Sequence, residues 1–315
     1  MSAGAGDEEP ADAVVLPVDP AILGAFPEGA EPAQPTLEEQ RRAYGEIAIA
    51  MGGEPVAVER VSDLSIPRPG GGSVPARAYH PHGAAAGALP ALVWFHGGGW
   101  VLGDLDGFDR VARRLADAGG CVCVSVDYRL APEHPFPAAV EDADAVVAWL
   151  TGAGAAGVGV DPARVSVGGD SAGGQLAAVA ALHARDRVRG QFLVYPALDP
   201  AADSESYTQF ADGPGLTAAA MGAFWDAYRA GLPIDTPDLD VTRADLDAAP
   251  AAYLAIAGHD PLRDDGRRYA RLLRDAGVQT EVRTYLSMTH GFLRWGALVD
   301  DAQDVIAWFG SAAAG

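Results

Sequence analysis

The segment "GGDSAGGQLAAVAAL", residues 168–182, places one serine between glycines. The apolar run "RVSVGG" at 164–169 leads into it, and the alanine-rich stretch that follows has helical character. Residues 169–173 fit the pattern GxSxG, and a strand that ends in this pattern just before a helix is what a nucleophile elbow requires. A serine that only capped the helix would need none of these glycines. We therefore interpret Ser171 as a nucleophile on a tight turn.

Around this turn, apolar runs of strand length alternate with helical segments along most of the chain. Two runs, at 56–66 and 74–81, are separated by turn residues. They predict a pair of antiparallel strands with which the chain enters the sheet. The later runs alternate with helices, which predicts the α/β class: a mostly parallel central sheet with helices on both faces. These later runs are 91–96, 121–128, 164–169, 191–196, 252–258 and 280–285.

The chain divides into a start, a core and an insertion. Residues 1–55 are expected to contain a disordered beginning and then a helix, for which Thr36 is the N-cap and Glu39 closes a capping box. The longest interruption, 198–245, is rich in Asp, Pro and Ala and carries the amphipathic stretch "TAAAMGAFWDAYRAG". We interpret it as an insertion. The core is then formed by residues 56–197 and 246–315.

The composition limits the classes of function. With 315 residues, of which 49% are hydrophobic and 21% charged, the chain is long enough for one large globular domain. It has 22 basic and 43 acidic residues, a formal net charge of -21, and every basic residue is arginine. A surface this acidic repels phosphates, so we expect neither a nucleic-acid nor a membrane partner.

Cysteine usage and the beginning of the chain indicate a reducing compartment. Cys121 and Cys123 are two residues apart in an apolar run, a spacing at which a strand does not allow a bridge. They are predicted to be buried strand residues rather than metal ligands. The acidic start does not resemble a signal peptide, and no apolar run reaches the ~18 residues of a membrane span. We therefore expect a cytoplasmic protein.

A serine hydroxyl needs a base that removes its proton, and histidine is the usual one. His290 follows the last apolar run, Gly291 allows a close turn there, and the chain order is then serine, acid, histidine. The acid belongs in the loop after the preceding strand, where Asp260 is nearest the strand end and Asp264 is the alternative. The histidines in turns, in a predicted helix or beside Asp260 fit less well: His80, His82, His134, His183 and His259.

The segment "WFHGGGW" ends at Trp100 and follows a predicted strand. Three consecutive glycines expose backbone N–H groups, which suits an oxyanion that must be approached by main chain. A glycine run could also be a flexible loop or a phosphate cradle, but its position after a strand and the separate GxSxG motif favour an oxyanion hole. His96 is predicted to anchor this loop rather than to act as the base.

Five motifs occur in one order between roughly residues 70 and 310: HGGGW, DYRLAPEHPFPAA, GDSAGG, DPLRDDG and HGF. Together they resemble the bacterial hormone-sensitive-lipase family of esterases, which have the α/β-hydrolase fold. The resemblance implies that Ser171 is the nucleophile, His290 the base and Asp260 the acid. It also implies a helical cap made by the N-terminal segment and the insertion. The amides that it places in the oxyanion hole are those of Gly98, Gly99 and Ala172.

The predicted function is a serine carboxylesterase that hydrolyses short- to medium-chain esters of carboxylic acids through an acyl-enzyme intermediate, with no metal or cofactor. Trp100 and Phe292 could narrow the substrate pocket, or they could pack in the core. A lyase or dehydratase, or a non-catalytic small-molecule receptor on the same scaffold, is the alternative, although a receptor would usually lack a member of the triad. A homodimer could form through the last strand, 280–285, whose edge would otherwise be unpaired.

Overall fold

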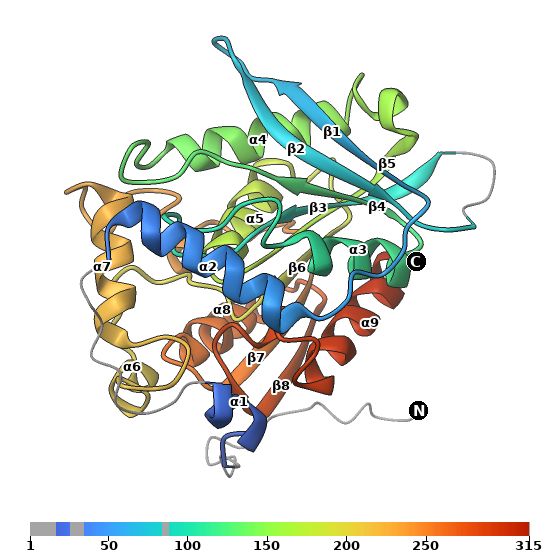
Figure 1. The fold of residues 1–315 in the computed structure, drawn as a ribbon. Helices are drawn as coiled ribbons and strands as arrows, with labels where there is room; N and C mark the ends of the chain where they lie inside the picture. Colours follow the sequence, from blue (N-terminus) through green and yellow to red (C-terminus); the bar gives the residue numbers. More distant parts are fainter. Residues whose placement is uncertain (1–16, 26–34, 84–87, 315) are drawn as a thin grey trace, which may run out of the picture.

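An eight-stranded sheet runs through the protein in the order β1-β2-β4-β3-β5-β6-β7-β8 (Figure 1). In this computed structural model, which describes residues 17–25, 35–83 and 88–314, β2 pairs antiparallel with both β1 and β4. The other neighbouring strands are parallel, which confirms the predicted sheet and its antiparallel entry. The strands are β1 (Arg60–Pro67), β2 (Ser73–His80), β3 (Leu89–Phe95), β4 (Val122–Val126), β5 (Val160–Asp170), β6 (Gly190–Val194), β7 (Ala251–His259) and β8 (Thr280–Thr289).

Successive side chains of the central strands face two separate hydrophobic cores. In β3, Val93 and Phe95 pack in the core that α4, α5 and α8 cover, whereas Leu92 and Trp94 pack in the core that α3 and α9 cover. Because both faces are buried, these strands are continuous apolar runs rather than alternating ones. The covering helices are α3 (Asp109–Gly119), α4 (Ala138–Leu150), α5 (Ala172–His183), α8 (Arg263–Asp275) and α9 (Asp300–Ala314), with the short η1 (Ala155–Val158) and η3 (Phe292–Arg294).

The two cysteines are buried and free, as predicted. Cys121 directly precedes β4 and Cys123 lies within it, and both face the core on the α3 and α9 side. Burial raises the pKa of the Cys121 thiol to about 12. The thiol therefore stays protonated at neutral pH and has little nucleophilic character.

The N-terminal region contains the predicted helix and one that was not predicted. Helix α2 (Leu37–Gly52) begins with a complete capping box: Thr36 Oγ1 accepts from the Glu39 amide at 3.3 Å, and Glu39 Oε2 accepts from the Thr36 amide at 2.8 Å. The short helix α1 (Pro20–Ala25) precedes it, and Asp19 Oδ1 accepts from the Ala21 amide at 2.8 Å. Six residues are too few to show a helical period. The predicted disordered beginning lies outside the described residues.

The segment between β6 and β7 forms helices α6 (Glu205–Gln209) and α7 (Ala218–Arg229) and the short η2 (Val241–Arg243). Helix α7 begins at Thr217, whose side chain accepts from the amide of Ala220 at 3.1 Å. Its buried side chains, Met221, Trp225 and Tyr228, are four and three residues apart and therefore lie on one face. None of the described helices combines the length and the apolar character that crossing a bilayer requires.

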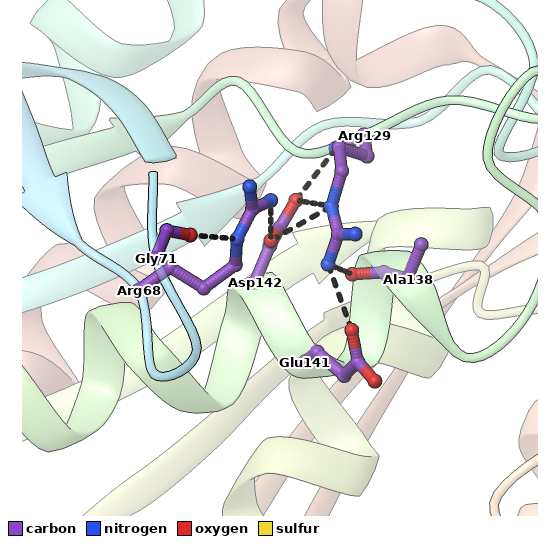
Figure 2. Close-up of polar contacts among 6 residues, drawn as sticks. All are labelled: Arg68, Gly71, Arg129, Ala138, Glu141 and Asp142. Atoms are coloured by element: carbon purple, nitrogen blue, oxygen red, sulfur yellow. Dashed lines mark hydrogen bonds and ion pairs between the residues drawn. The ribbon is translucent and has the colours of Figure 1, made fainter. Parts of the chain in front are cut away.

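A buried carboxylate fastens three segments that are distant in the sequence. Asp142 of α4 is 1% exposed and accepts from the Arg129 backbone N–H and Nε, both at 2.9 Å, and from Arg68 Nη1 at 3.1 Å (Figure 2). Arg129 also donates to the carbonyl of Ala138 and to Glu141, both at 2.9 Å. The turn after β1 and the segment after β4 are thus both bound to α4. This network explains why the "DYRLAPEHPFPAA" motif carries an arginine.

Removing the Asp142 carboxylate should destabilise the fold far more than removing its exposed neighbour. We expect Asp142→Ala to lower the free energy of unfolding by about 3 kcal/mol, because two arginines lose a buried partner. Glu141 bonds the same Arg129, but its side chain is 58% exposed. Glu141→Ala should therefore cost less than ~1 kcal/mol. Urea unfolding of both variants measures the difference, and equal losses would contradict the role given to Asp142.

Candidate active site

Ser171 lies on a strained turn between the end of β5 and the start of α5, with φ +56° and ψ -121°. This backbone region is unfavourable for a residue with a side chain, so the surroundings must hold it. The residues two positions before and after it must be glycines for steric reasons. A Cβ at Gly169 would lie 2.2 Å from the Gly173 carbonyl oxygen, and one at Gly173 would lie 1.9 Å from that of Phe95. The Ser171 side chain makes no capping hydrogen bond to α5.

The structure brings Ser171, His290 and Asp260 together in one chain of hydrogen bonds. His290 Nε2 lies 2.8 Å from Ser171 Oγ, and His290 Nδ1 lies 2.7 Å from Asp260 Oδ2. His290 directly follows β8 and Asp260 directly follows β7, so parallel strands deliver both to the same edge of the sheet. A carboxylate only accepts, so Nδ1 carries the proton that faces it and Nε2 is left to accept from the serine hydroxyl.

Asp260 is fully buried, while Ser171 and His290 keep 6% and 8% of their surface exposed. The second Asp260 oxygen accepts from the Leu262 amide at 2.8 Å, which holds the carboxylate in place. The alternative acid, Asp264, points elsewhere: it accepts from the Ser206 amide and pairs with Arg263, both at 2.9 Å. Among the two candidates, only Asp260 therefore contacts the histidine.

The three glycines after β3 form a tight loop beside the serine. Gly98 and Gly99 have φ values of +128° and +61°, and a Cβ at Gly98 would lie 2.2 Å from the Leu102 carbonyl oxygen. Within the described part of the chain, the amide N–H groups of Gly98, Gly99 and Ala172 donate to no acceptor. These are the three amides that the resemblance assigned to an oxyanion hole, and they are free to donate hydrogen bonds to a ligand oxygen.

His96 holds this loop and does not contact the serine. Its Nδ1 lies 2.9 Å from the Gly97 carbonyl oxygen, its ring stacks on Tyr128 at 4.4 Å, and the Tyr128 hydroxyl donates to its carbonyl at 2.7 Å. Burial lowers the pKa of His96 to about 4, so the ring is neutral at physiological pH. These contacts fit the predicted anchoring role.

Sequence reasoning did not single out Asp170, the residue before the serine. It is buried, and its Oδ1 accepts from the amide of Gly97 at 3.0 Å. This bond joins the end of β5 to the glycine loop. Burial raises the pKa of Asp170 to about 6, against the lowering influence of Arg294 and of the Gly97 amide. The variable position of a GxSxG pattern gives no signal for such a contact, because its partner is 73 residues away.

The two aromatic residues proposed to narrow the pocket are fully buried. The Trp100 ring stacks on Tyr228 with centroids 4.4 Å apart, and Phe292 packs against Tyr195 at 5.5 Å and Tyr285 at 5.2 Å. These contacts fit the packing alternative that the sequence left open. A contact of either ring with substrate stays a prediction.

Two residues of the segment between β6 and β7 lie directly against the site, and sequence reasoning missed both. A Cβ at Gly99 would lie 2.3 Å from the ring of Phe224 in α7, and a Cβ at Gly215 would lie 2.6 Å from the carbonyl oxygen of His290. The insertion therefore covers both the glycine loop and the histidine. The helical spacing in residues 198–245 indicates the buried face of α7, but it does not predict that these two positions lie against the glycine loop and the histidine.

Within the described ranges, no three His, Cys, Asp or Glu side chains are arranged so that they could hold a metal ion.

Comparison with known proteins agrees with this geometry. The sequence model of the Abhydrolase_3 family, described as alpha/beta hydrolase fold, matches residues 92–294. The carboxylic ester hydrolase LipN of Mycobacterium tuberculosis is 44% identical over 258 residues, 78% of this chain and 68% of that protein. The ethyl acetate hydrolase of Pseudomonas putida is 36% identical over 281 residues, 85% of this chain and 86% of that protein. The structure of an esterase from Pyrobaculum calidifontis matches with a TM-score of 0.87 at 36% identity, covering 95% of this chain and 98% of that one.

The fold and the site thus define an α/β-hydrolase. More narrowly, the chain belongs to the hormone-sensitive-lipase-like family of this fold, as its motifs predicted.

Proposed function

We propose that the site hydrolyses short- to medium-chain esters of carboxylic acids through an acyl-enzyme intermediate. As a member of its family, the chain is a carboxylic ester hydrolase of the serine type. The observation that carries the proposal is the unbroken hydrogen-bond chain from Asp260 through His290 to the hydroxyl of Ser171. This complete series of hydrogen bonds supports a hydrolase over a non-catalytic receptor, because a receptor would not need a histidine aligned with the serine.

The proposed mechanism assigns one role to each group. Ser171 Oγ attacks the ester carbonyl carbon while His290 Nε2 takes its proton, and Asp260 stabilises the resulting imidazolium. The tetrahedral oxyanion accepts hydrogen bonds from amides of the glycine loop and of Ala172. His290 then protonates the leaving alcohol as the tetrahedral intermediate collapses to the acyl-enzyme. A water molecule, deprotonated by His290, attacks the acyl carbon, and the carboxylic acid leaves as Ser171 regains its proton.

Variants of the three groups should separate the assigned roles. Ser171→Ala and His290→Ala should each lower kcat by several orders of magnitude, and the double variant should be little worse, because the two groups act as a unit. Asp260→Asn should also be severe, since the histidine loses its orientation. Asp264→Asn is the matched control and should be mild. Steady-state hydrolysis of 4-nitrophenyl acetate checks all five enzymes.

Near-normal turnover in Ser171→Ala or His290→Ala would reject the proposed chemistry. A reversed order of the two aspartate variants would instead move the acid to Asp264.

We also propose that α2 and residues 198–245 form a cap over a core of residues 56–197 and 246–315. Arg41 of α2 supports this division: its Nε donates to the Val101 carbonyl at 2.8 Å, and its Nη2 pairs with Glu133 at 2.7 Å. The other support is the contact of Phe224 with Gly99. On this proposal, cap side chains rather than core side chains set which esters fit.

The cap proposal predicts a short acyl optimum. The relative from Pseudomonas putida is named for ethyl acetate, a two-carbon acyl ester, which supports a small pocket here. Each methylene group of the acyl chain that fits into the pocket should add up to roughly 0.8 kcal/mol to the binding free energy. The value of kcat/KM should therefore rise with acyl length and then fall steeply where the chain becomes longer than the pocket. We expect Phe224→Ala to shift the optimum to longer chains. Leu232→Ala, which changes a 37% exposed residue after α7, should leave the optimum unchanged.

A series of 4-nitrophenyl esters from two to sixteen acyl carbons, about the range that separates esterases from lipases, makes this measurement. A rate that keeps rising beyond about twelve carbons, or that jumps when the substrate forms an emulsion, would contradict a short-chain esterase.

We further propose a homodimer that joins β8 to its copy. The support is the position of β8 at the edge of the sheet, where its outer backbone groups have no neighbouring strand in the sheet order. Sedimentation equilibrium should then give twice the chain mass, which is 32.4 kDa. A monomer at high concentration would exclude the dimer.

A cytoplasmic location also stays a prediction. The two free thiols support it, and cell fractionation checks it.

A further inference from the structure

One buried amide side chain joins the glycine loop, the nucleophile helix and the insertion. Gln175 lies one turn into α5 and has no exposed surface. Its Oε1 accepts from Trp100 Nε1 at 3.1 Å, and its Nε2 donates to the backbone carbonyl of Asp238. The mechanism described above uses none of these groups. The loss of either hydrogen bond would leave a buried polar group unpaired, which costs free energy. The two bonds therefore hold the glutamine side chain and its partners in one arrangement.

The segment that Gln175 holds is conformationally strained. Trp100 has φ +59°, continuing the positive φ values of Gly98 and Gly99. A bulky residue persists in this region only where its surroundings determine it. Trp100 is held by its ring, which stacks on Tyr228 with an interplanar angle of 1°, by a hydrogen bond from the Ala131 amide to its carbonyl at 2.8 Å, and by Gln175.

The other end of the connection is the helix that begins at the nucleophile. The Gln175 amide donates to the Ser171 carbonyl at 3.3 Å, so the side chain projects from the first turn of α5. Ala172, whose amide belongs to the same turn, supplies one part of the candidate oxyanion hole. Gly98 and Gly99, which lie just before Trp100, supply the other part. The two parts come from segments about 70 residues apart, and the indole-to-glutamine bond connects them.

We propose that Gln175 is a positioning residue that fixes the separation between the two parts of the oxyanion hole. The inference rests on the proposed function and deepens it. Loss of the bond would leave every donor present but let the glycine loop move relative to Ala172. Misplacement of a preorganised donor by about 1 Å can cost up to ~100-fold in rate. Substrate binding outside the reacting carbonyl would be little affected, so the loss belongs in kcat.

Gln175→Met tests this, because methionine has a similar length and removes both hydrogen bonds. We expect kcat for 4-nitrophenyl acetate to fall roughly 10- to 100-fold with KM changed less than about twofold. Trp100→Phe, which removes the indole donor from the other side, should give a similar fall. The double variant should be little worse than the poorer single variant, because both single variants break the same bond between Trp100 and Gln175. The inhibition constant of an aryl trifluoromethyl ketone, which forms a tetrahedral adduct at the serine, should rise by a factor comparable to the loss in kcat/KM.

Tyr269→Phe is the matched control for a general loss of stability. It removes another buried hydrogen bond from an aromatic ring to a glutamine, the one from the Tyr269 hydroxyl to Gln191 Oε1 at 3.3 Å, in the sheet core. We expect a fall in urea unfolding midpoint similar to that of Gln175→Met, with unchanged kcat. If Tyr269→Phe lost as much activity as Gln175→Met, the effect would be one of stability and the inference would be wrong.

Wild-type kcat in Gln175→Met, a change in KM alone, an unchanged inhibition constant, or additive losses in the double variant would each overturn the inference. Ser171→Ala, assayed in parallel, separates this failure from a failure of the proposed function. Activity retained by Ser171→Ala would reject the serine esterase itself. An inactive Ser171→Ala with unaffected Gln175 variants would reject only the positioning role.

Discussion

The strained backbone of Ser171 is the constraint on which the rest of the site depends. A residue with φ near +56° costs on the order of 1–3 kcal/mol, so the fold must hold it from both sides. Strand β5 does so from the interior of the sheet, between β3 and β6, and α5 does so as a helix buried along its length. The glycines at 169 and 173 leave room for the carbonyls that approach the turn. The result is a hydroxyl raised above the sheet edge at which β7 and β8 deliver Asp260 and His290.

Buried side chains then connect each segment of the site to its neighbour. Asp170 bonds the glycine loop to the end of β5, and Gln175 bonds Trp100 to α5. Asp265 at the start of α8 accepts from the amides of Leu198 and Asp199, at 3.2 and 3.3 Å, where the insertion leaves the core. None of these groups needs to touch a substrate. In the proposed mechanism, their common effect is to fix donors and charges before the reaction begins, which is how a preorganised site stabilises a transition state.

The sequence predicted what local pattern and chain order can encode. The central strands are buried on both faces and were identifiable as continuous apolar runs, the first two strands were identifiable from the turn residues between them, and the capping box at Thr36 and Glu39 marked the start of α2. Asp260 and His290 could be chosen because parallel strands bring their carboxyl ends to one edge. Helix α1 was missed because it is shorter than two helical turns. The roles of Asp170, Gln175 and Phe224 were missed for a different reason: each depends on a partner more than 70 residues away, and no spacing rule reports such contacts.

The central claim is that His290 makes Ser171 a nucleophile, and a covalent label tests it most directly. Attack of Ser171 Oγ on diethyl 4-nitrophenyl phosphate forms an O–P bond and releases 4-nitrophenolate, while His290 takes the hydroxyl proton. Mass spectrometry of the digested protein should locate one diethylphosphoryl group on Ser171. Its formation should parallel the loss of esterase activity, and the His290→Gln variant should be labelled far more slowly. Complete inhibition with Ser171 unmodified, or labelling that is equally fast without the histidine, would contradict this account.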